Sequence, residues 1–323
     1  RRRATAAGVE GFDDLLRLVN SSRNIVFITG AGCSTGSGIP DYRGVGGSYS
    51  KGHKPMTHDN FMSSEGERKR YWARSIKGWP PFYRARPNPT HTAIAQLEQM
   101  GRVRRVITQN VDGLHQKAGS TRVIELHGTN HVVRCMGCGM LSDRNDHQRL
   151  IAAVNHWWMK QNTIFSVAPE WQKFDGDAKA AQSRDSSEPN PSLGLRADGD
   201  AELGEGLDYS AVRVPECKKC GGILKPDVVY FGDSVPRPRV HDAADAVAGS
   251  DMVLVVGSSL SVLSSFRLVL QAKDQNTPIA VINMGATRAE REGVPLLKLE
   301  GECGSVLQAL VESLETSPSA AQG

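Results

Sequence analysis

Apolar residues gather in short runs along the chain, and each run gives way at once to small or polar residues. Such runs lie at residues 24–29, 103–108, 252–256 and 279–282. Mostly apolar runs without a strict alternation of apolar and polar residues are typical of strands that are buried on both faces of a sheet. The pattern therefore predicts a parallel sheet of buried strands.

Apolar residues at helical spacing lie before and between these runs. They cover residues 10–19, 91–99 and 262–273. Buried strands that alternate with helices indicate an α/β fold whose parallel sheet carries helices on both faces. Ligands of such folds bind beyond the carboxyl ends of the strands, which is where the polar residues after each run are expected.

The composition is that of an ordinary globular protein, with 39% hydrophobic residues, 23% charged residues and a formal net charge of +4. The basic residues are spread along the chain, so we expect no direct binding of nucleic acid. No stretch approaches the roughly 18 apolar residues of a membrane span, so we expect no membrane contact. Residues 175–210 are rich in Asp, Glu, Ser, Gly and Pro, which predicts a flexible acidic insert.

Two C-x-x-C pairs are the clearest chemical signal in the chain. They are formed by Cys135, Cys138, Cys217 and Cys220. Two thiolates at this spacing can bind one metal ion from a single tight turn, and two pairs complete the tetrahedral sulfur shell of a zinc site. Because four thiolates leave no coordination position for water, the sequence predicts one structural zinc ion.

The chain begins with three arginines, followed by an alanine-rich stretch with few acids. Such a beginning is typical of the end of an organelle transit peptide, and equally of a disordered basic tail. We expect an organellar location, in the mitochondrial matrix, with a plastid or the cytoplasm as alternatives. Residues 1–10 and 313–323 are predicted to be disordered tails.

A glycine turn, GAGCS at residues 30–34, follows the first apolar run. Its backbone amides could face a pyrophosphate, although the third glycine of the usual dinucleotide fingerprint is absent and a plain strand-to-helix turn is the alternative. Residues 36–47 continue it as a long glycine-rich loop, which in compact domains is either functional or disordered. Within it, Arg43 could pair with phosphate and Asp41 could hydrogen-bond a ligand, or both are surface charges.

Two further polar motifs lie between the second apolar run and the first cysteine pair. The first, TQNVDGLH at residues 108–115, offers amide and carboxylate groups suited to a ribose and a carboxamide. The second, ELHG at residues 125–128, places His127 shortly before the first cysteine pair. A histidine there can act as a general base near neutral pH, although a solitary histidine is often structural.

Several motifs occur together in one order. They are GAGCS at 30–34, GIPDYR at 38–43, TQNVD at 108–112, HG at 127–128, the two cysteine pairs, KPDVVYFGD at 225–233 and GSSL at 257–260. In this order the chain resembles the sirtuins, which are NAD-dependent protein-lysine deacylases, over about residues 11–310. Its PDYR, YWAR and FGD segments resemble the class II branch, which is found in mitochondria and plant organelles.

The resemblance implies two domains. A large Rossmann-type NAD-binding domain would comprise residues 11–128 and 224–312, with a helical and loop module at about 45–90. A small zinc-ribbon domain would be inserted at residues 129–223 and would carry the acidic insert. NAD, a co-substrate, and acyl-lysine would meet in the cleft between them.

Motif matching also implies which residues bind NAD. Ile39, Asp41, Asn110 and Asp112 would form the nicotinamide pocket, and the ribose next to it would contact Gln109. The full set implied to bind NAD is Gly30, Ala31, Gly32, Ser34, Ile39, Asp41, Tyr42, Arg43, Gln109, Asn110, Asp112, Gly257, Ser258, Ser259, Asn283 and Cys303.

The implied reaction consumes NAD. The amide oxygen of acyl-lysine would attack the ribose carbon that bears nicotinamide, so that nicotinamide leaves and an alkylimidate forms. His127, which the resemblance implies is catalytic together with Asn110 and Asp112, would then remove a proton from the ribose hydroxyls, so that the 2′-oxygen attacks the imidate carbon. Water would complete the reaction, giving free lysine and O-acyl-ADP-ribose. No hydride is transferred, which argues against an ordinary dehydrogenase.

The resemblance further implies that acyl-lysine proteins or peptides bind by strand addition. The residues implied to line this site are Val229, Tyr230, Phe231 and Gly232. Tyr71 and Arg74 have the spacing that desuccinylating sirtuins use to bind an acyl carboxylate, which would favour glutaryl or methylglutaryl groups. Alternatively, Arg74 is an exposed charge on a surface helix. Lipoyl removal is a further activity of class II members.

Two other functions stay open at this point. A protein mono-ADP-ribosyltransferase would leave ADP-ribose on its protein target. A non-catalytic, zinc-containing module that senses NAD would bind NAD without releasing nicotinamide.

Overall fold

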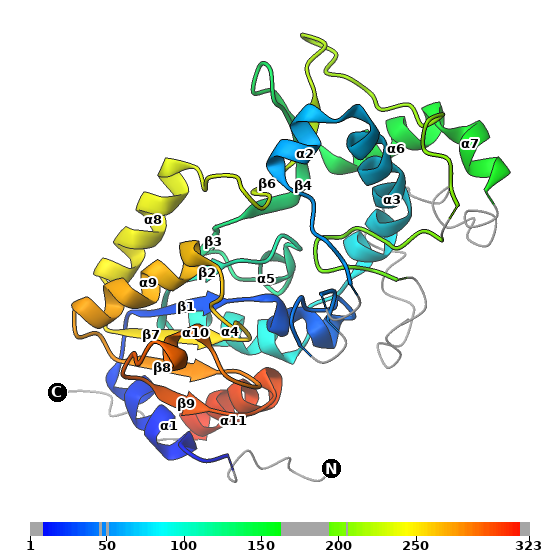
Figure 1. The fold of residues 1–323 in the computed structure, drawn as a ribbon. Helices are drawn as coiled ribbons and strands as arrows, with labels where there is room; N and C mark the ends of the chain where they lie inside the picture. Colours follow the sequence, from blue (N-terminus) through cyan, green and yellow to red (C-terminus); the bar gives the residue numbers. More distant parts are fainter. Residues whose placement is uncertain (1–8, 45–46, 50–51, 163–193, 205, 317–323) are drawn as a thin grey trace, which may run out of the picture. The chain divides into compact units, whose positions relative to one another are not determined.

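The four apolar runs form the central strands of a six-stranded parallel sheet in the order β3-β2-β1-β7-β8-β9. This computed structural model describes residues 9–44, 47–49, 52–162, 194–204 and 206–316 (Figure 1). The strands are β1 (Ile25–Thr29), β2 (Val103–Thr108), β3 (Val123–Glu125), β7 (Met252–Val256), β8 (Ile279–Ile282) and β9 (Leu297–Leu299). The predicted parallel α/β sheet is therefore confirmed, and β9 is a strand that the hydrophobic pattern missed.

The chain divides into two units. The first comprises Arg1–Gly36, Arg86–Leu126 and Val235–Gly323, and the second comprises Ser37–Ala85 and His127–Ser234. Residues 37–85 thus belong with the cysteine-bearing segment, whereas the sequence assigned them to the NAD-binding domain. Side-chain contacts within the second unit explain the grouping, because Arg74 forms an ion pair with Asp200.

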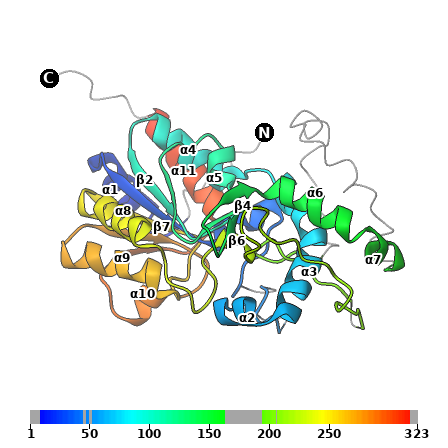
Figure 2. The same cartoon turned by 90° about the horizontal axis from the view of Figure 1, so that it is seen from above.

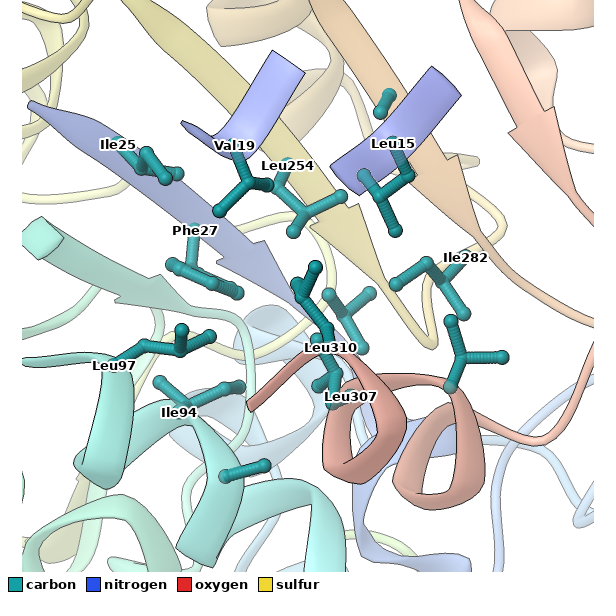
Figure 3. Close-up of a cluster of buried hydrophobic side chains, with 14 of the residues drawn as sticks. Leu15, Val19, Ile25, Phe27, Ile94, Leu97, Leu254, Ile282, Leu307 and Leu310 are labelled. Atoms are coloured by element: carbon teal, nitrogen blue, oxygen red, sulfur yellow. The ribbon is translucent and has the colours of Figure 1, made fainter. Parts of the chain in front are cut away.

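Helices cover both faces of the sheet in the first unit, as predicted (Figure 2). Phe27 and Leu254 face one layer of helices, and Ile28 and Val255 face the other. Figure 3 shows the first of these layers, in which aliphatic side chains of α1, α4 and α11 meet the sheet. The helices of the first unit are α1 (Phe12–Ser21), α4 (Pro89–Gln99), α5 (Leu114–Lys117), α8 (Arg237–Ala248), α9 (Leu263–Asp274), α10 (Arg288–Arg291) and α11 (Cys303–Thr316).

Helix α11 extends into residues that were expected to belong to the carboxyl-terminal tail. It continues through Thr316, so residues 313–316 are helical rather than part of a disordered tail. Its buried residues Leu307, Leu310 and Val311 pack in the core and hold the helix on the sheet. Residues 1–8 and 317–323 of the expected tails lie outside the described residues.

The second unit contains a three-stranded antiparallel sheet in the order β5-β4-β6. Its elements are α2 (His58–Ser63), α3 (Glu65–Arg84), β4 (Gly128–Cys135), β5 (Leu141–Asp143), α6 (Arg144–Val154), α7 (His156–Gln161) and β6 (Leu224–Val228). Arg144 is 1% exposed and its guanidinium lies 5.2 Å and 4.8 Å from the ring centres of Trp72 and Trp79. No helix among the described residues is long and apolar enough to cross a membrane.

The described part of the predicted acidic insert is packed on helix α3. A Cβ atom added to Gly78 would lie 2.4 Å from the Gly199 carbonyl oxygen, so only glycine permits this approach. Lys77 and Lys69 of α3 donate hydrogen bonds to the backbone of Glu202 and Ser210. Residues 175–193 of the insert lie outside the described residues.

Candidate active site

The glycine turn after β1 forms a 3-10 helix, Ala31–Ser37, packed on the end of β7. The N–H of Gly30 donates to Val256 O at 3.1 Å, and the N–H of Gly32 donates to Gly257 O at 2.9 Å. A Cβ atom on Gly30 or Gly32 would lie 2.8 Å or 2.9 Å from Gly257 O. These two glycines therefore serve the close packing of two strand ends, and their amides already have partners.

Three polar side chains meet beyond the carboxyl ends of β1 and β2. The Ser34 hydroxyl donates to Asp112 Oδ2 at 2.7 Å, and the Asn110 amide donates to Ser34 Oγ at 3.0 Å and to Gly30 O at 3.1 Å. Asp112 is 3% exposed, and its other oxygen accepts the N–H of Leu114 at 2.9 Å. The structure thus brings Ser34, Asn110 and Asp112 together in one network.

A second network connects β2 to the loop after β7. Gln109 donates to Ser258 Oγ at 2.8 Å, and the Ser265 hydroxyl donates to Gln109 Oε1 at 2.9 Å. Ser259, next to it, is 3.0 Å from Ser261 between their hydroxyl oxygens. Ser265, which the sequence motifs did not single out, orients the amide that is implied to contact the ribose.

The two solitary cysteines are buried beside neighbouring strand ends. Cys33 Sγ lies 3.2 Å from Val256 O, and Cys303 Sγ lies 3.7 Å from Ile282 O. Burial raises the pKa of Cys303 to about 12 and that of Cys33 well above its usual value. Because the thiolate is the reactive form, both thiols are suited to packing rather than to nucleophilic chemistry. Asn283, at the end of β8, caps the next turn by donating to Met284 O and Gly285 O.

Below pH 6.5 the first unit is expected to lose stability through a buried histidine pair. His91 and His115 have ring centres 4.9 Å apart, and burial lowers the pKa of His91 to about 4, partly opposed by Asp112. Burial and His91 lower the pKa of His115 well below its usual value. Since unfolded histidine titrates near pH 6.5, protons favour the unfolded chain as the pH falls, at a cost of about 3 kcal/mol for His91.

Thermal unfolding between pH 7 and pH 4.5 checks this expectation. His91→Gln should show a smaller loss of melting temperature across this range than the wild type, whatever its stability at pH 7. His241→Ala, a change at an exposed position on α8, serves as the control. An identical pH dependence of His91→Gln and wild type would contradict it.

The four paired cysteines converge in the second unit. Their sulfur atoms all lie within 4.8 Å of one another, with Cys135–Cys220 at 3.5 Å and Cys138–Cys217 at 3.8 Å. Zn–S bonds of about 2.3 Å in a tetrahedron place sulfurs about 3.8 Å apart. The donor set therefore fits a structural zinc ion. Each pair is followed by a glycine with positive φ, +74° at Gly139 and +70° at Gly221, which lets the chain turn tightly around the metal.

Residues of the GIPDYR motif fold back on themselves in the second unit. Asp41 Oδ1 accepts the N–H of Gly44 at 2.9 Å, and Ile39 is 2% exposed. Tyr42 and Tyr49 have ring centres 5.4 Å apart, and Arg43 lies over the Tyr49 ring at 5.1 Å. Asp41 thus stabilises the loop locally, while Arg43 is an exposed charge.

His127 lies beside the segment implied to bind peptide. Its carbonyl oxygen accepts the N–H of Val229 at 2.8 Å, next to the Gly128–Val228 pair of β4 and β6. Tyr230 packs between Tyr71 and Phe61, with ring centres 5.8 Å and 5.5 Å away. Burial raises the pKa of Tyr71 well above its usual value, so its phenol stays protonated and its role there is packing.

Arg74 has a carboxylate partner within the chain. Its guanidinium lies 2.9 Å from Asp200 Oδ2, and its Nε donates to Ala201 O at 3.3 Å. The side chain is 15% exposed, so Arg74 is no exposed surface charge. Arg196 lies 3.5 Å from the same Asp200 oxygen. No motif marks Asp200, which stands in an acidic stretch of the sequence, and only the folded chain identifies it.

The implied site residues belong to both units. Those of the first unit are Gly30, Ala31, Gly32, Ser34, Gln109, Asn110, Asp112, Gly257, Ser258, Ser259, Asn283 and Cys303. Those of the second are Ile39, Asp41, Tyr42, Arg43, Tyr71, Arg74, His127, Val229, Tyr230, Phe231, Gly232 and the four paired cysteines. Within each unit, side chains that are far apart in the chain come together at strand ends.

A family model described as "Sir2 family" matches residues 30–264, from the glycine turn to α9. The chain belongs to the Sir2 family. It is 44% identical to the NAD-dependent protein deacylase Sirt4 of Drosophila melanogaster over 93% of this chain and 87% of that protein. It is also 41% identical to the NAD-dependent protein deacylase SRT2 of Arabidopsis thaliana, over 96% of this chain and 78% of that protein.

Solved Sir2 structures share the fold. A complex of Sir2 with a p53 peptide and NAD+ has a TM-score of 0.67 and 25% identity, covering 95% of this chain and 99% of that one.

A bacterial protein is similar to the chain in sequence. This Bradyrhizobium diazoefficiens protein, named NAD-dependent protein deacetylase 2, is 44% identical over 90% of this chain and 93% of that protein. The Sir2 match and the converging cysteines confirm the expected fold class, including the metal-binding module.

Proposed function

We propose that this chain is an NAD-dependent protein-lysine deacylase that cleaves NAD to nicotinamide and transfers the acyl group from lysine to ADP-ribose. One observation carries the proposal: this Sir2-family chain is similar to named deacylases along nearly its whole length, and its sequence contains His127, Asn110 and Asp112. NAD would be the co-substrate, and the paired cysteines, whose sulfur atoms converge, would hold one structural zinc ion. The test is nicotinamide release that depends on both NAD and an acyl-lysine peptide.

The residues of the first unit would orient the nicotinamide half of NAD. Asn110 and Ser34 hold the Asp112 carboxylate in place through the Ser34 hydroxyl, so its orientation is set before the substrate binds. A carboxylate accepts a hydrogen bond from a carboxamide nitrogen. Gln109, held by Ser258 and Ser265, would present its amide to the adjoining ribose.

His127 would act as the general base. Imidazole can accept a proton near neutral pH, and this residue stands at the start of β4 beside the peptide segment. The zinc ion would supply no chemistry to this step, because four thiolates complete its shell. Its cysteines would instead hold β4 and β6 at the positions from which His127 and Val229 extend.

Acyl-lysine proteins or peptides would bind by strand addition along residues 229–232. Backbone pairing of this kind places few demands on the peptide sequence. Tyr71 and Tyr230, whose ring centres lie 5.8 Å apart, would contact the acyl chain.

The preferred acyl group depends on what Arg74 can bind. An acidic acyl group such as glutaryl or methylglutaryl would compete with Asp200 for this guanidinium. Asp200→Asn is therefore expected to raise kcat/KM for glutaryl-lysine relative to acetyl-lysine by roughly tenfold, and Arg74→Ala to lower that ratio by a similar factor. A kinetic screen of acetyl-, succinyl-, glutaryl-, methylglutaryl- and lipoyl-lysine peptides measures both.

Glu202→Gln is the matched control, because this exposed carboxylate lies 3.9 Å from Arg196 and makes no ion pair with Arg74 among the described residues. If Arg74→Ala leaves the preference among acyl groups unchanged, Arg74 does not bind the acyl chain. The deacylase proposal itself would survive that result, since acetyl-lysine turnover tests it separately.

Two alternatives make different products. A mono-ADP-ribosyltransferase would add ADP-ribose to a target protein, which mass spectrometry detects. An NAD sensor without activity would bind NAD and release no nicotinamide with any peptide of the screen. The presence of His127, Asn110 and Asp112 in the sequence favours turnover over sensing.

We further propose an organellar location, the mitochondrial matrix first. The resemblance to class II sirtuins and the basic, alanine-rich start of the sequence support it. Bacterial proteins are equally similar to the chain, so localisation of a tagged full-length protein is the deciding measurement.

A further inference from the structure

We propose that His58 is a positioning residue, which together with Lys225 holds the Asp233 carboxylate and so keeps residues 229–233 ready to pair with a substrate backbone. This inference rests on the proposed deacylase function. All of the contacts that carry it lie within the second unit.

The start of helix α2 is attached to this segment at two points. The backbone N–H of His58 donates to Phe231 O at 2.9 Å, next to a parallel bridge between Thr57 and Phe231. The His58 imidazole then reaches two residues further, where Nδ1 lies 3.2 Å from Asp233 Oδ2. Backbone and side chain of one residue thus hold both sides of Gly232.

Lys225 holds the same turn from β6. Its side chain is 5% exposed, and Nζ lies 3.7 Å from Asp233 Oδ2. The same ammonium lies 4.3 Å from the centre of the Tyr230 ring and donates to Val228 O. A buried ammonium needs such partners, so Asp233 lies between a fixed cation and the imidazole of His58.

The turn that these groups hold leaves part of its backbone unpaired. Asp233 N–H donates to Tyr230 O at 3.0 Å, and Gly232 has a φ of +82°, which closes a tight turn. Among the described residues, the N–H groups of Tyr230 and Gly232 have no backbone partner. Phe231 is 39% exposed beside them. Unpaired backbone groups next to an exposed apolar side chain suit the addition of a peptide strand.

Holding this turn in place before the peptide arrives would reduce the entropy lost on binding. The contribution of His58 should therefore appear in the KM for the peptide and leave the chemistry of NAD cleavage unchanged. A merely structural role would instead lower protein stability, or it would lower kcat and raise the KM for NAD.

The experiment compares His58→Ala with Asn60→Ala in the full chain. Asn60 is an exposed residue of the same helix, and among the described residues its side chain forms no hydrogen bond or ion pair with residues 229–233. For His58→Ala, the peptide KM is expected to rise about three- to tenfold, as for loss of a partly exposed ion pair. The kcat, the KM for NAD and the melting temperature should stay close to those of Asn60→Ala.

His58→Asn adds a rescue test, because an amide nitrogen can take the place of Nδ1 beside Asp233. It is expected to restore most of the peptide KM. In a double-mutant cycle, Asp233→Asn should add little to His58→Ala, which identifies Asp233 as the partner. Asp233→Asn could fail to fold, because Lys225 would lose its carboxylate partner. In that case the rescue of the peptide KM by His58→Asn decides whether His58 positions the peptide segment.

An unchanged peptide KM in His58→Ala, or no rescue by His58→Asn, would overturn the inference while wild-type deacylation still supports the proposed function. Absence of NAD-dependent deacylation in the wild type would instead refute the proposed function. The two failures are therefore distinguishable.

Discussion

Replacing His127 by alanine should lower the turnover of an acyl-lysine peptide about 10²- to 10⁴-fold, the range typical of removing a general base. Nicotinamide departure precedes the proton removal assigned to His127, so NAD binding and the exchange of labelled nicotinamide should persist. Measuring both reactions on the same variant separates the base from a residue that merely binds NAD.

His241→Ala is a suitable control, because this histidine is exposed on α8 in the first unit. Its turnover and exchange should match the wild type. If His127→Ala loses exchange and turnover in parallel, His127 acts before nicotinamide leaves. If it loses neither, another group is the base.

Removing the zinc ion should abolish activity by unfolding the second unit. Structural zinc sites contribute apparent binding free energies of about 10–16 kcal/mol, which exceeds the stability of most domains. β4 begins at Gly128 and carries Cys135, and β6 begins four residues after Cys220, so loss of the metal releases both strands. Hydrogen exchange should then rise in β4 and β6 and stay low in β1 and β7.

Cys217→Ser makes the same change without a chelator, and Cys303→Ser is the matched control because Cys303 lies outside the metal cluster. The control should retain zinc, measured by metal analysis, and nearly wild-type exchange in β4. A metal-free protein that keeps its melting temperature would contradict a structural zinc. One that keeps its fold but stops cleaving NAD would indicate a catalytic metal instead.

Much of the first unit could be predicted from local sequence. The runs that form β1, β7 and β8 are almost entirely apolar, because helices cover both faces of the sheet. Burial on both faces requires apolar residues at nearly every position, so these strands can be recognised from sequence. β9 is three residues long and half-buried, so its pattern is too short to distinguish from a loop. Residues 313–316 were expected to belong to the carboxyl-terminal tail, yet they form the last turn of helix α11.

The grouping of residues 37–85 with the cysteine-bearing segment could not be predicted. It depends on contacts across more than 100 positions of sequence, such as Arg74 with Asp200, and no local propensity encodes such a contact. The close packing of Gly78 on Gly199 could not be predicted from sequence either, because a glycine inside a helix usually indicates only a lower helix propensity.

The sequence by itself determined the class of fold and the four cysteines that converge, and it supplied the residues proposed to react. Those features rest on residue types and short spacings, such as C-x-x-C, which chemistry restricts tightly. The tertiary structure decided which side chains constrain one another: Ser34 and Asn110 around Asp112, Asp200 on Arg74, and His58 on Asp233. Each of these is a contact between elements, and its energy depends on distances that exist only once both elements have packed.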